Sequence, residues 1–234
     1  MVNVFSFCLY GPYNPRYYGP LVENIRIAEK HFPDWKVWIH VAPDVDKGYV
    51  SQLRSYPNVV VVETMVTGPA NMITRFFTID DATVDIMFVR DADSLLHHRD
   101  RWAIQRFIEQ EQFVAHTIRD HVDHGARIMG GLWGIRKSSG LHMQTEYQKY
   151  LQNPKDMGVA HDQNFLSAHI YPLVKDRLLV TYSNNMVFYG ETGEEFPFSW
   201  TSDLYCGRIE LPPPPKEYAK VAKFENGKFT IRAK

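Results

Sequence analysis

The strongest constraint on the fold is that short apolar runs alternate with segments of helical periodicity along the first half of the chain. Strands are predicted at Val2–Leu9, Lys36–Val41, Val59–Glu63, Asp85–Arg90 and Phe113–Ile118. Helices are predicted between them, at Tyr18–His31, Lys47–Ser55, Ala70–Ile79 and Arg101–Glu111. This order is typical of βαβ units and predicts an α/β fold with a mainly parallel central sheet flanked by helices. The nearly pure valine run Val59–Glu63 predicts a strand that is buried on both faces.

The second half of the chain is less regular. It predicts a helix at Leu141–Leu151, another that starts near Asp162, and a late strand at Leu178–Tyr182. Four prolines at 212–215 are predicted to end the globular unit, because proline continues neither a helix nor a central strand. We therefore expect one domain over residues 1–211, and a Pro-rich linker and tail over 212–234. Within this tail, Asn226-Gly227 between alternating residues predicts a hairpin.

Composition excludes several classes of protein. The 234 residues carry a formal net charge of -1, without the basic excess typical of proteins that bind nucleic acid. Two cysteines, Cys8 and Cys206, are too few for a disulfide framework or a Cys-rich zinc site. No run approaches the ~18 to 20 apolar residues that span a bilayer, and the N-terminus lacks the pattern of a secretory signal. The sequence predicts a cytoplasmic protein without a transmembrane segment.

Two acidic residues follow the fourth predicted strand. Asp91 and Asp93 come directly after the apolar run that ends at Arg90, with the small Ala92 between them. Ligands of parallel sheets bind beyond the carboxyl ends of the strands. In extended geometry, residues i and i+2 point to the same side, so both carboxylates are expected to face one cation. Carboxylate oxygens suit Mg²⁺ or Mn²⁺.

The region around this pair resembles the Asp-x-Asp strand of glycosyltransferases with the GT-A fold. Further segments recur in the same order in a small group of these enzymes, and the resemblance spans roughly residues 2 to 185. The segments that carry it are Met72–Phe77, Val84–Ser94, Ile118–His121, Met129–Gly134 and His161–Leu166.

The resemblance implies roles on the donor side. Asp93 would bind the metal that bridges the two phosphates, with Asp91 as its neighbour. The loop after the first strand would receive the nucleotide, with Tyr10 stacking on a pyrimidine and Gly11 letting the backbone approach. Arg75 would contact phosphate or a sugar hydroxyl. Arg90 has two open roles, a second phosphate contact or a structural partner of a nearby aspartate.

The same resemblance implies a sugar and acceptor side. Gly131, Leu132 and Trp133 would form a backbone-lined pocket under the donor sugar. Asp162 is predicted either to cap a helix or to act as the catalytic base of an inverting transfer. In a retaining transfer, Asp162 or Gln163 would instead hold the donor sugar. Asp120 and His121 are predicted sugar or acceptor contacts.

These expectations describe a metal-dependent glycosyltransferase. It would move a hexose or deoxyhexose from a nucleotide-diphosphate sugar, preferably a UDP-sugar, to a glycan acceptor, with Mn²⁺ or Mg²⁺ as cofactor. The late histidine that many retaining members supply as a metal ligand has no counterpart in Val180–Asn185, so either an Asn or water would fill that coordination position, or the metal would be held loosely.

Four other functions compete with this hypothesis. The first is a metal-dependent phosphohydrolase built from Asp120 and the histidines His116, His121 and His124. A non-catalytic sugar-binding domain is the second. A nucleotidyltransferase is disfavoured because the loop after the first strand is not basic and Gly-rich. A dinucleotide oxidoreductase is disfavoured because no Gly-x-Gly-x-x-Gly follows that strand.

Overall fold

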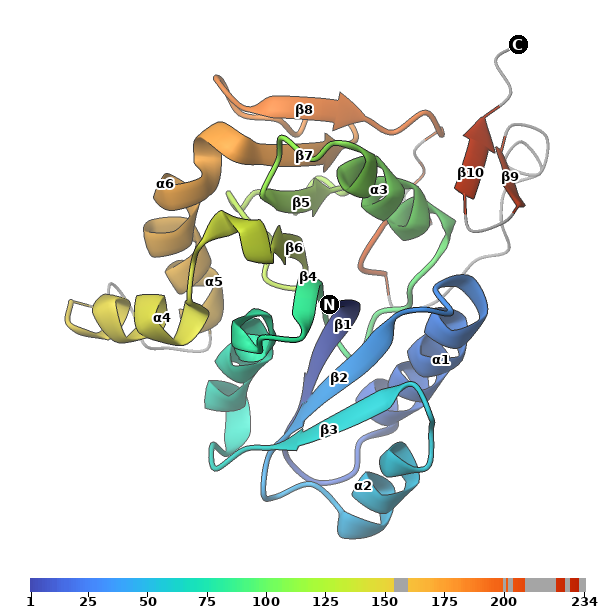
Figure 1. The fold of residues 1–234 in the computed structure, drawn as a ribbon, viewed down its shortest axis with the longest axis vertical. Helices are drawn as coiled ribbons and strands as arrows, with labels where there is room; N and C mark the ends of the chain where they lie inside the picture. The colour runs from blue at the N-terminus through green and yellow to red at the C-terminus, as the bar shows by residue number, and fades with distance from the viewer. Residues whose placement is uncertain (154–159, 200, 202–203, 209–221, 226–227, 232–234) are drawn as a thin grey trace.

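An eight-stranded sheet forms the centre of the molecule (Figure 1). The computed structural model describes residues 1–153, 160–199, 201, 204–208, 222–225 and 228–231. The strand order is β3-β2-β1-β4-β6-β5-β7-β8. Their bounds are β1 Val2–Leu9, β2 Lys36–Val41, β3 Val59–Glu63, β4 Val84–Arg90, β5 Ala115–Arg119, β6 Leu132–Arg136, β7 Leu178–Tyr182 and β8 Thr192–Glu195. Strand β6 is antiparallel to both β4 and β5, and the other pairings in this sheet are parallel. The carboxyl ends of β1, β4 and β5 therefore meet at one edge.

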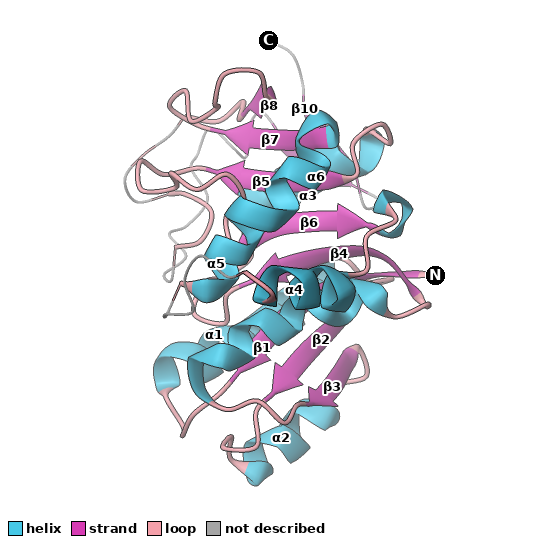
Figure 2. Cartoon of the chain, turned by 90° about the vertical axis from the view of Figure 1, so that its left-hand side faces the viewer, coloured by secondary structure: helices cyan, strands magenta, loops and turns pink. Residues whose placement is uncertain are grey.

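Helices cover both faces of the sheet (Figures 1 and 2). One face packs against α1 (Pro15–His31), α2 (Lys47–Arg54) and α3 (His98–Glu109). The other packs against the 3₁₀ helix η1 (Gly68–Asp80), α4 (Met143–Leu151), α5 (His161–Phe165) and the π-helical turn η3 (Leu166–Ile170), which continues into α6 (Tyr171–Val174). Single turns η2 (Lys137–Ser139) and η4 (Lys175–Arg177) follow β6 and α6.

Strand alternation divides the core in two. In β4, Phe88 faces the α1 side, whereas Met87 and Val89 face η1. Successive side chains of a strand point to opposite faces, so an unbroken apolar strand needs helices on both sides. The mainly parallel α/β fold predicted from the sequence is confirmed.

Three local predictions need correction. Strand β3 is half-buried and lies at the edge of the sheet, so the prediction of burial on both faces was wrong. Strand β6, at Leu132–Arg136, was not predicted from the sequence. It requires Gly134, because a Cβ there would lie 2.6 Å from the ring of Phe88. The third predicted helix is η1, a 3₁₀ helix of 13 residues rather than an α-helix.

The tail is described only in part. Strands β9 (Ala222–Glu225) and β10 (Lys228–Ile231) pair antiparallel. The prolines at 212–215 and Asn226-Gly227 lie outside the described residues. The division of the chain at residue 211 stays a prediction. None of the helices in the described ranges has both the length and the apolar character that crossing a membrane requires.

The 3₁₀ geometry of η1 separates its side chains by function. With three residues per turn, positions i and i+3 lie in one row. The row of Ile73, Phe76 and Ile79 is buried in the core. A second row carries Arg75 and Thr78, and Ser6 of β1 ties it to the sheet by donating to the Arg75 carbonyl at 2.7 Å and by bonding to the Thr78 hydroxyl at 2.8 Å. Arg75 is thereby fixed at the carboxyl edge.

A buried histidine in this network predicts acid sensitivity. The Nε2 of His40 lies 2.7 Å from the Thr78 hydroxyl, and burial, with a contribution from the charge of Arg75, lowers the pKa of His40 to about 3. Below pH 6.5 the unfolded chain binds a proton that the folded chain excludes, so stability falls as the pH drops from 6.5 towards 3. At pH 5 this one group costs about 2 kcal/mol of the free energy of unfolding. Urea denaturation at pH 5, 6 and 7.5 should show that the free energy of unfolding depends less on pH in His40→Gln than in the unchanged chain. The same pH dependence in both would contradict this prediction.

Candidate functional site

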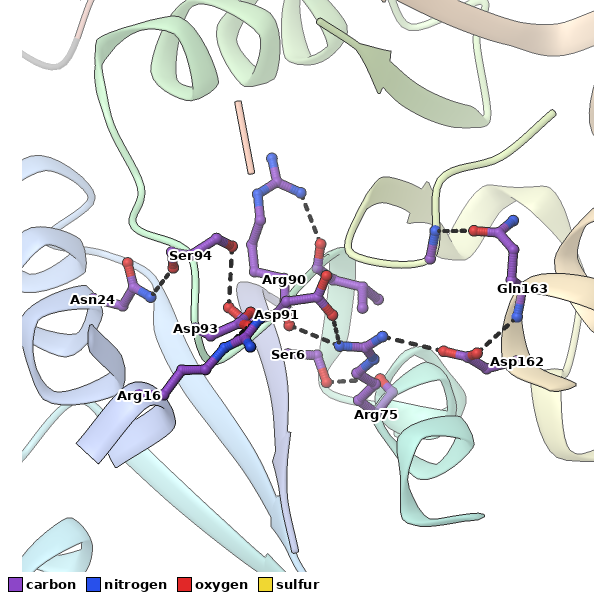
Figure 3. Close-up of polar contacts among 12 residues, drawn as sticks. Ser6, Arg16, Asn24, Arg75, Arg90, Asp91, Asp93, Ser94, Asp162 and Gln163 are labelled. Atoms are coloured by element: carbon purple, nitrogen blue, oxygen red, sulfur yellow. Dashed lines mark hydrogen bonds and ion pairs between the residues drawn. The ribbon is translucent and has the colours of Figure 1, made fainter. Parts of the chain in front are cut away.

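A cavity of about 220 Å³ opens at the carboxyl edge of the sheet, where β1 and β4 lie side by side. Figure 3 shows the polar contacts of three of its lining residues, Arg75, Asp91 and Asp93, with their neighbours. The loop after β1, helix η1 and the turn after β4 all contribute to its walls. The lining residues are Cys8, Leu9, Tyr10, Tyr17, Met72, Arg75, Asp91, Ala92 and Asp93. The strand ends singled out from the sequence therefore do bound a cavity.

The Asp91–Ser94 segment is a turn, so the extended geometry expected for it was wrong. Ser94 N donates to Asp91 O at 3.4 Å, and the buried Asn24 of α1 holds the turn by donating to Ser94 O at 2.8 Å and accepting from Leu96 N at 2.8 Å. Both carboxylates still belong to residues that line the cavity, as does Ala92, which also packs on the core. That the two carboxylates face one cation stays a prediction.

Arg75 is the central cation of the site. Its side chain is buried, and Nη1 donates to Asp91 Oδ1 at 2.5 Å and to Arg90 O at 3.1 Å, while Nη2 donates to Asp162 Oδ2 at 3.2 Å. Burial opposes its charge, but Asp91, Cys8 and Asp162 raise the pKa of Arg75 above its ordinary value. A rigid guanidinium therefore joins the turn after β4 to the start of α5.

A second arginine meets the other carboxylate. Arg16, in the first turn of α1, places Nε 2.9 Å and Nη2 2.7 Å from Asp93 Oδ2. The Arg16 side chain is 56% exposed, whereas that of Asp93 is 16% exposed. Each carboxylate of the Asp-x-Asp pair is thus matched by its own arginine, one buried and one at the surface.

Gly131 lies against the first carboxylate. A Cβ on Gly131 would stand 1.9 Å from Asp91 Oδ2, far inside contact distance. The sequence predicted that glycine here would leave room for a donor sugar. In the structure the Asp91 carboxylate occupies that space. The absence of a side chain at Gly131 therefore lets Asp91 keep its position.

Asp162 is the second residue of α5, and Ala160 is the N-cap. The predicted capping role was therefore wrong. Its Oδ1 accepts from Gln163 N at 2.8 Å and its Oδ2 from Arg75, and its side chain is 8% exposed. Gln163 accepts from Gly130 N at 2.8 Å and donates to Ile128 O, so it fixes the segment before β6. The start of α5 is thereby bonded both to Arg75 and to the segment before β6.

The loop after β1 has the predicted position. Tyr10 lines the cavity, and burial raises its pKa. Gly11 has φ +76°, a left-handed conformation that favours glycine, and a Cβ there would meet nothing within 4 Å. The turn therefore accounts for this glycine, and its role towards a nucleotide stays a prediction.

Arg90 takes the second of its two open roles. Its side chain is buried, and its guanidinium bonds to Asp100 Oδ1 at 3.2 Å and to Val89 O at 2.8 Å. In Figure 3 it points away from Asp91 and Asp93. Arg90 thus ties the end of β4 to the start of α3.

Two residues of the expected sugar pocket lie in the core. Trp133 is fully buried in β6, edge-on to Phe76 at 5.2 Å between ring centroids. Leu132 is 4% exposed and packs with Trp102 and Ile118. Neither side chain lines the cavity, so both support the site by packing.

Asp120 is also engaged by the protein. It is fully buried and receives two bonds from Arg99, at 2.6 and 2.5 Å, one from Ser183 at 2.6 Å and one from Cys206 N at 2.8 Å. His121 lies nearer the surface, with its ring 4.2 Å from that of Tyr205. Asp120 thus anchors the segment that contains Cys206, and the ring of His121 packs beside the same segment.

The histidines at 116–124 do not form a metal centre in the described part of the chain. His116 is fully buried, stacked on Phe107 and bonded to Thr181, and burial, with a contribution from the charge of Arg90, lowers its pKa well below the ordinary value. His124 Nδ1 accepts from Asp120 N at 3.0 Å. The predicted hydrolase cluster therefore lacks its first member.

Among the described residues, one set of three side chains brings its ligand atoms within 4.8 Å of one another: His97, Asp100 and Cys206. His97 already accepts from Arg99 N at 3.1 Å and donates to Tyr205 O at 2.9 Å. Asp100 pairs with Arg90 and with His97 N. Since the imidazole uses both nitrogens on the backbone, we interpret this set as the cap of α3.

Sequence comparison identifies no relative. No protein-family model matches the chain, and no curated protein matches its sequence. Similarity is found among solved structures, at identities low enough to concern the fold alone.

Three solved structures illustrate that similarity. The galactosyltransferase LgtC, in complex with donor and acceptor sugar analogues, superimposes with a TM-score of 0.51 at 14% identity, over 77% of this chain and 73% of its own. The fold is GT-A-like. The mannosyltransferase PcManGT from Pyrobaculum calidifontis, in complex with GDP-Man and Mn²⁺, gives 0.50 at 16% identity, over 80% and 55%. A 4-diphosphocytidyl-2C-methyl-D-erythritol synthase from Anaerococcus prevotii gives 0.52 at 10% identity, over 80% and 89%. Because the fold extends beyond sugar transfer, function has to be argued from the site.

Sequence reasoning missed Tyr17, which lines the cavity, and Arg16, which pairs with the cavity residue Asp93. A signal for them was present. Asn14 caps α1 by accepting from Arg16 N, and Pro15 is its first residue, a pattern typical of a helix start. Starting the predicted helix at Asn14-Pro15 instead of Tyr18 would have placed Arg16 at the ligand edge.

Proposed function

We propose that this chain is a glycosyltransferase that uses a nucleoside-diphosphate sugar, with a UDP-sugar as donor and a glycan as acceptor. The observation that carries the proposal is the pairing of two carboxylates with two arginines around one cavity at the carboxyl edge. Carboxylates bind a divalent cation, and guanidinium groups bind phosphate oxygens through paired hydrogen bonds. A donor with two phosphates and a bound cation complements both.

The acidic pair fits Mn²⁺ or Mg²⁺. Asp91 and Asp93 offer hard oxygen ligands beside a cavity with room for water and phosphate, the coordination that Mg²⁺ prefers. When bound, the cation would neutralise charge that develops on the departing diphosphate. The PcManGT complex, which contains Mn²⁺ with a nucleotide sugar, supports this assignment.

The chain's own residues would orient the donor. Tyr10 offers a ring to a pyrimidine base, and Arg75 offers nitrogens to the sugar or phosphate side. For Asp162 we favour the role of holding Arg75 and the donor sugar over that of a base. A base must be open to the acceptor hydroxyl, and Asp162 is 8% exposed and engaged by Arg75. His121 is the candidate acceptor contact, and the donor sugar would be a hexose or deoxyhexose.

Nucleotide-dependent heat stability tests the proposal. We expect UDP with Mn²⁺ to raise Tm by about 5 °C at 100 times Kd, because a ligand that binds only the folded chain stabilises it by about 2.7 kcal/mol. UDP alone, CMP or NAD should do less. Asp93→Asn should lose the shift, whereas Asp34→Asn, at an exposed position before β2, should keep it.

The same experiment separates the alternatives. If no nucleotide changes Tm, with or without Mn²⁺, the transferase proposal is wrong. A response to sugars alone would then favour the non-catalytic sugar-binding domain. If UDP and Mn²⁺ do stabilise the chain, release of UDP from a panel of UDP-hexoses identifies the donor.

A further inference from the structure

Arg16 is bonded to one oxygen of the carboxylate that is proposed to bind the divalent cation. Both guanidinium nitrogens of Arg16 that contact Asp93 bond to Oδ2, at 2.9 and 2.7 Å. Figure 3 shows the arginine reaching from α1 to this carboxylate. A cation coordinated by Oδ2 would then stand beside the positive charge of Arg16. Like charges repel, so the two cannot share this oxygen without a counter-anion.

The charge of the site indicates what that anion is. Asp91, Asp93 and Asp162 carry three negative charges, and Arg75 and Arg16 carry two positive ones, which leaves a net charge of -1. A divalent cation alone would reverse this balance to +1. The diphosphate of a nucleotide sugar carries two negative charges and restores -1, and its oxygens accept from a guanidinium as well as a carboxylate does.

Arg16 is also free to move in a way that Arg75 is not. Its side chain is 56% exposed and rests beside the ring of Tyr17, a residue that lines the cavity. The first turn of α1 holds no acidic residue, so the positive end of the helix dipole adds to the attraction for an anion. Arg75, by contrast, is buried and held at three acceptors.

We propose that Arg16 is a donor-binding residue that exchanges Asp93 for the donor diphosphate, so that the cation binds tightly only together with the nucleotide. This inference rests on the proposed function. It assigns the two arginines different tasks: Arg75 holds the site in place, and Arg16 couples the two ligands.

Mn²⁺ binding to the purified full chain tests the exchange, with the electron paramagnetic resonance signal of unbound Mn²⁺ as the readout. For the unchanged chain, UDP should tighten Mn²⁺ binding by about 10- to 100-fold, within the usual range of coupling between two ligands. In Arg16→Gln, Mn²⁺ alone should bind about 10-fold more tightly, because Asp93 has lost its competitor, while UDP with Mn²⁺ should bind about 10-fold more weakly. These two effects have opposite signs, which a general loss of structure does not produce.

Arg26→Gln is the matched control, since Arg26 lies on the same helix but pairs with Glu23 on the surface. It should behave as the unchanged chain does. If Arg16→Gln weakens Mn²⁺ alone, or leaves both affinities unchanged, the exchange is refuted. If UDP with Mn²⁺ fails to bind the unchanged chain, the proposed function fails instead, so the two failures are distinguishable.

Discussion

Replacing Gly131 with alanine is expected to abolish donor turnover while the chain stays folded. The new Cβ would lie 1.9 Å from Asp91 Oδ2 and 2.3 Å from its Cγ, so the carboxylate has to leave its place. The Asp91 side chain is 48% exposed and can turn outward, which limits the loss of stability to about 1 kcal/mol. Its bond to Arg75 and its position at the cavity are lost. We expect turnover to fall at least ~100-fold, the cost of a misplaced group in a catalytic site.

Gly130→Ala is the matched control for this substitution. A Cβ at Gly130 would lie 3.4 Å from the Gln163 side-chain oxygen and 3.5 Å from Asp162 Oδ2, close to ordinary contact. Turnover of a UDP-sugar and the urea midpoint should be measured for both variants. Equal losses of turnover would show that the turn before β6 simply tolerates no side chain, and full activity of Gly131→Ala would show that Asp91 need not be held where it is.

The sequence predicted the fold from its strongest periodic segments. The runs now seen as β1, β2, β3 and β7 were predicted with correct bounds, because continuous apolar strands between helices are a local pattern. Strand β6 was missed because its pattern is not local. Gly134 weakens the strand propensity of its own segment and is explained only by the ring of Phe88 in the neighbouring strand.

The site was predicted in the same uneven way. Asp91, Asp93 and Arg75 line one cavity, as position at strand ends and the family resemblance implied. The sequence could not predict which polar residues are paired with other groups of the protein and so are not available to a ligand. Arg90 and Asp120 are polar and close to strand ends, yet each is buried in an ion pair with a partner from another element. Only the tertiary structure determines whether a charge has such a partner.

Removing the Arg75 guanidinium is expected to cost about 3 kcal/mol of stability as well as all turnover. Arg75→Met leaves the side chain of Asp162, which is 8% exposed, without its cation, and breaking a buried pair by removing one partner is strongly destabilising. Arg75→Lys keeps the charge. A single ammonium group on a lysine cannot reproduce the planar fork that reaches Asp91, the Arg90 carbonyl and Asp162 together. Lysine should therefore recover part of the stability but not the turnover.

Urea denaturation of a double-mutant cycle measures how much of this loss belongs to the pair. If the cost comes from the carboxylate left without a partner, Arg75→Met combined with Asp162→Asn should be more stable than Arg75→Met alone, since the amide carries no charge. Additive losses would instead mean that Arg75 stabilises the site through Asp91 and the Arg90 carbonyl. In the first case η1 and α5 are joined by the ion pair of Arg75 with Asp162. Of the two arginines, only the accessible Arg16 can then be changed without weakening the fold. Ligand coupling can therefore be tested cleanly at Arg16.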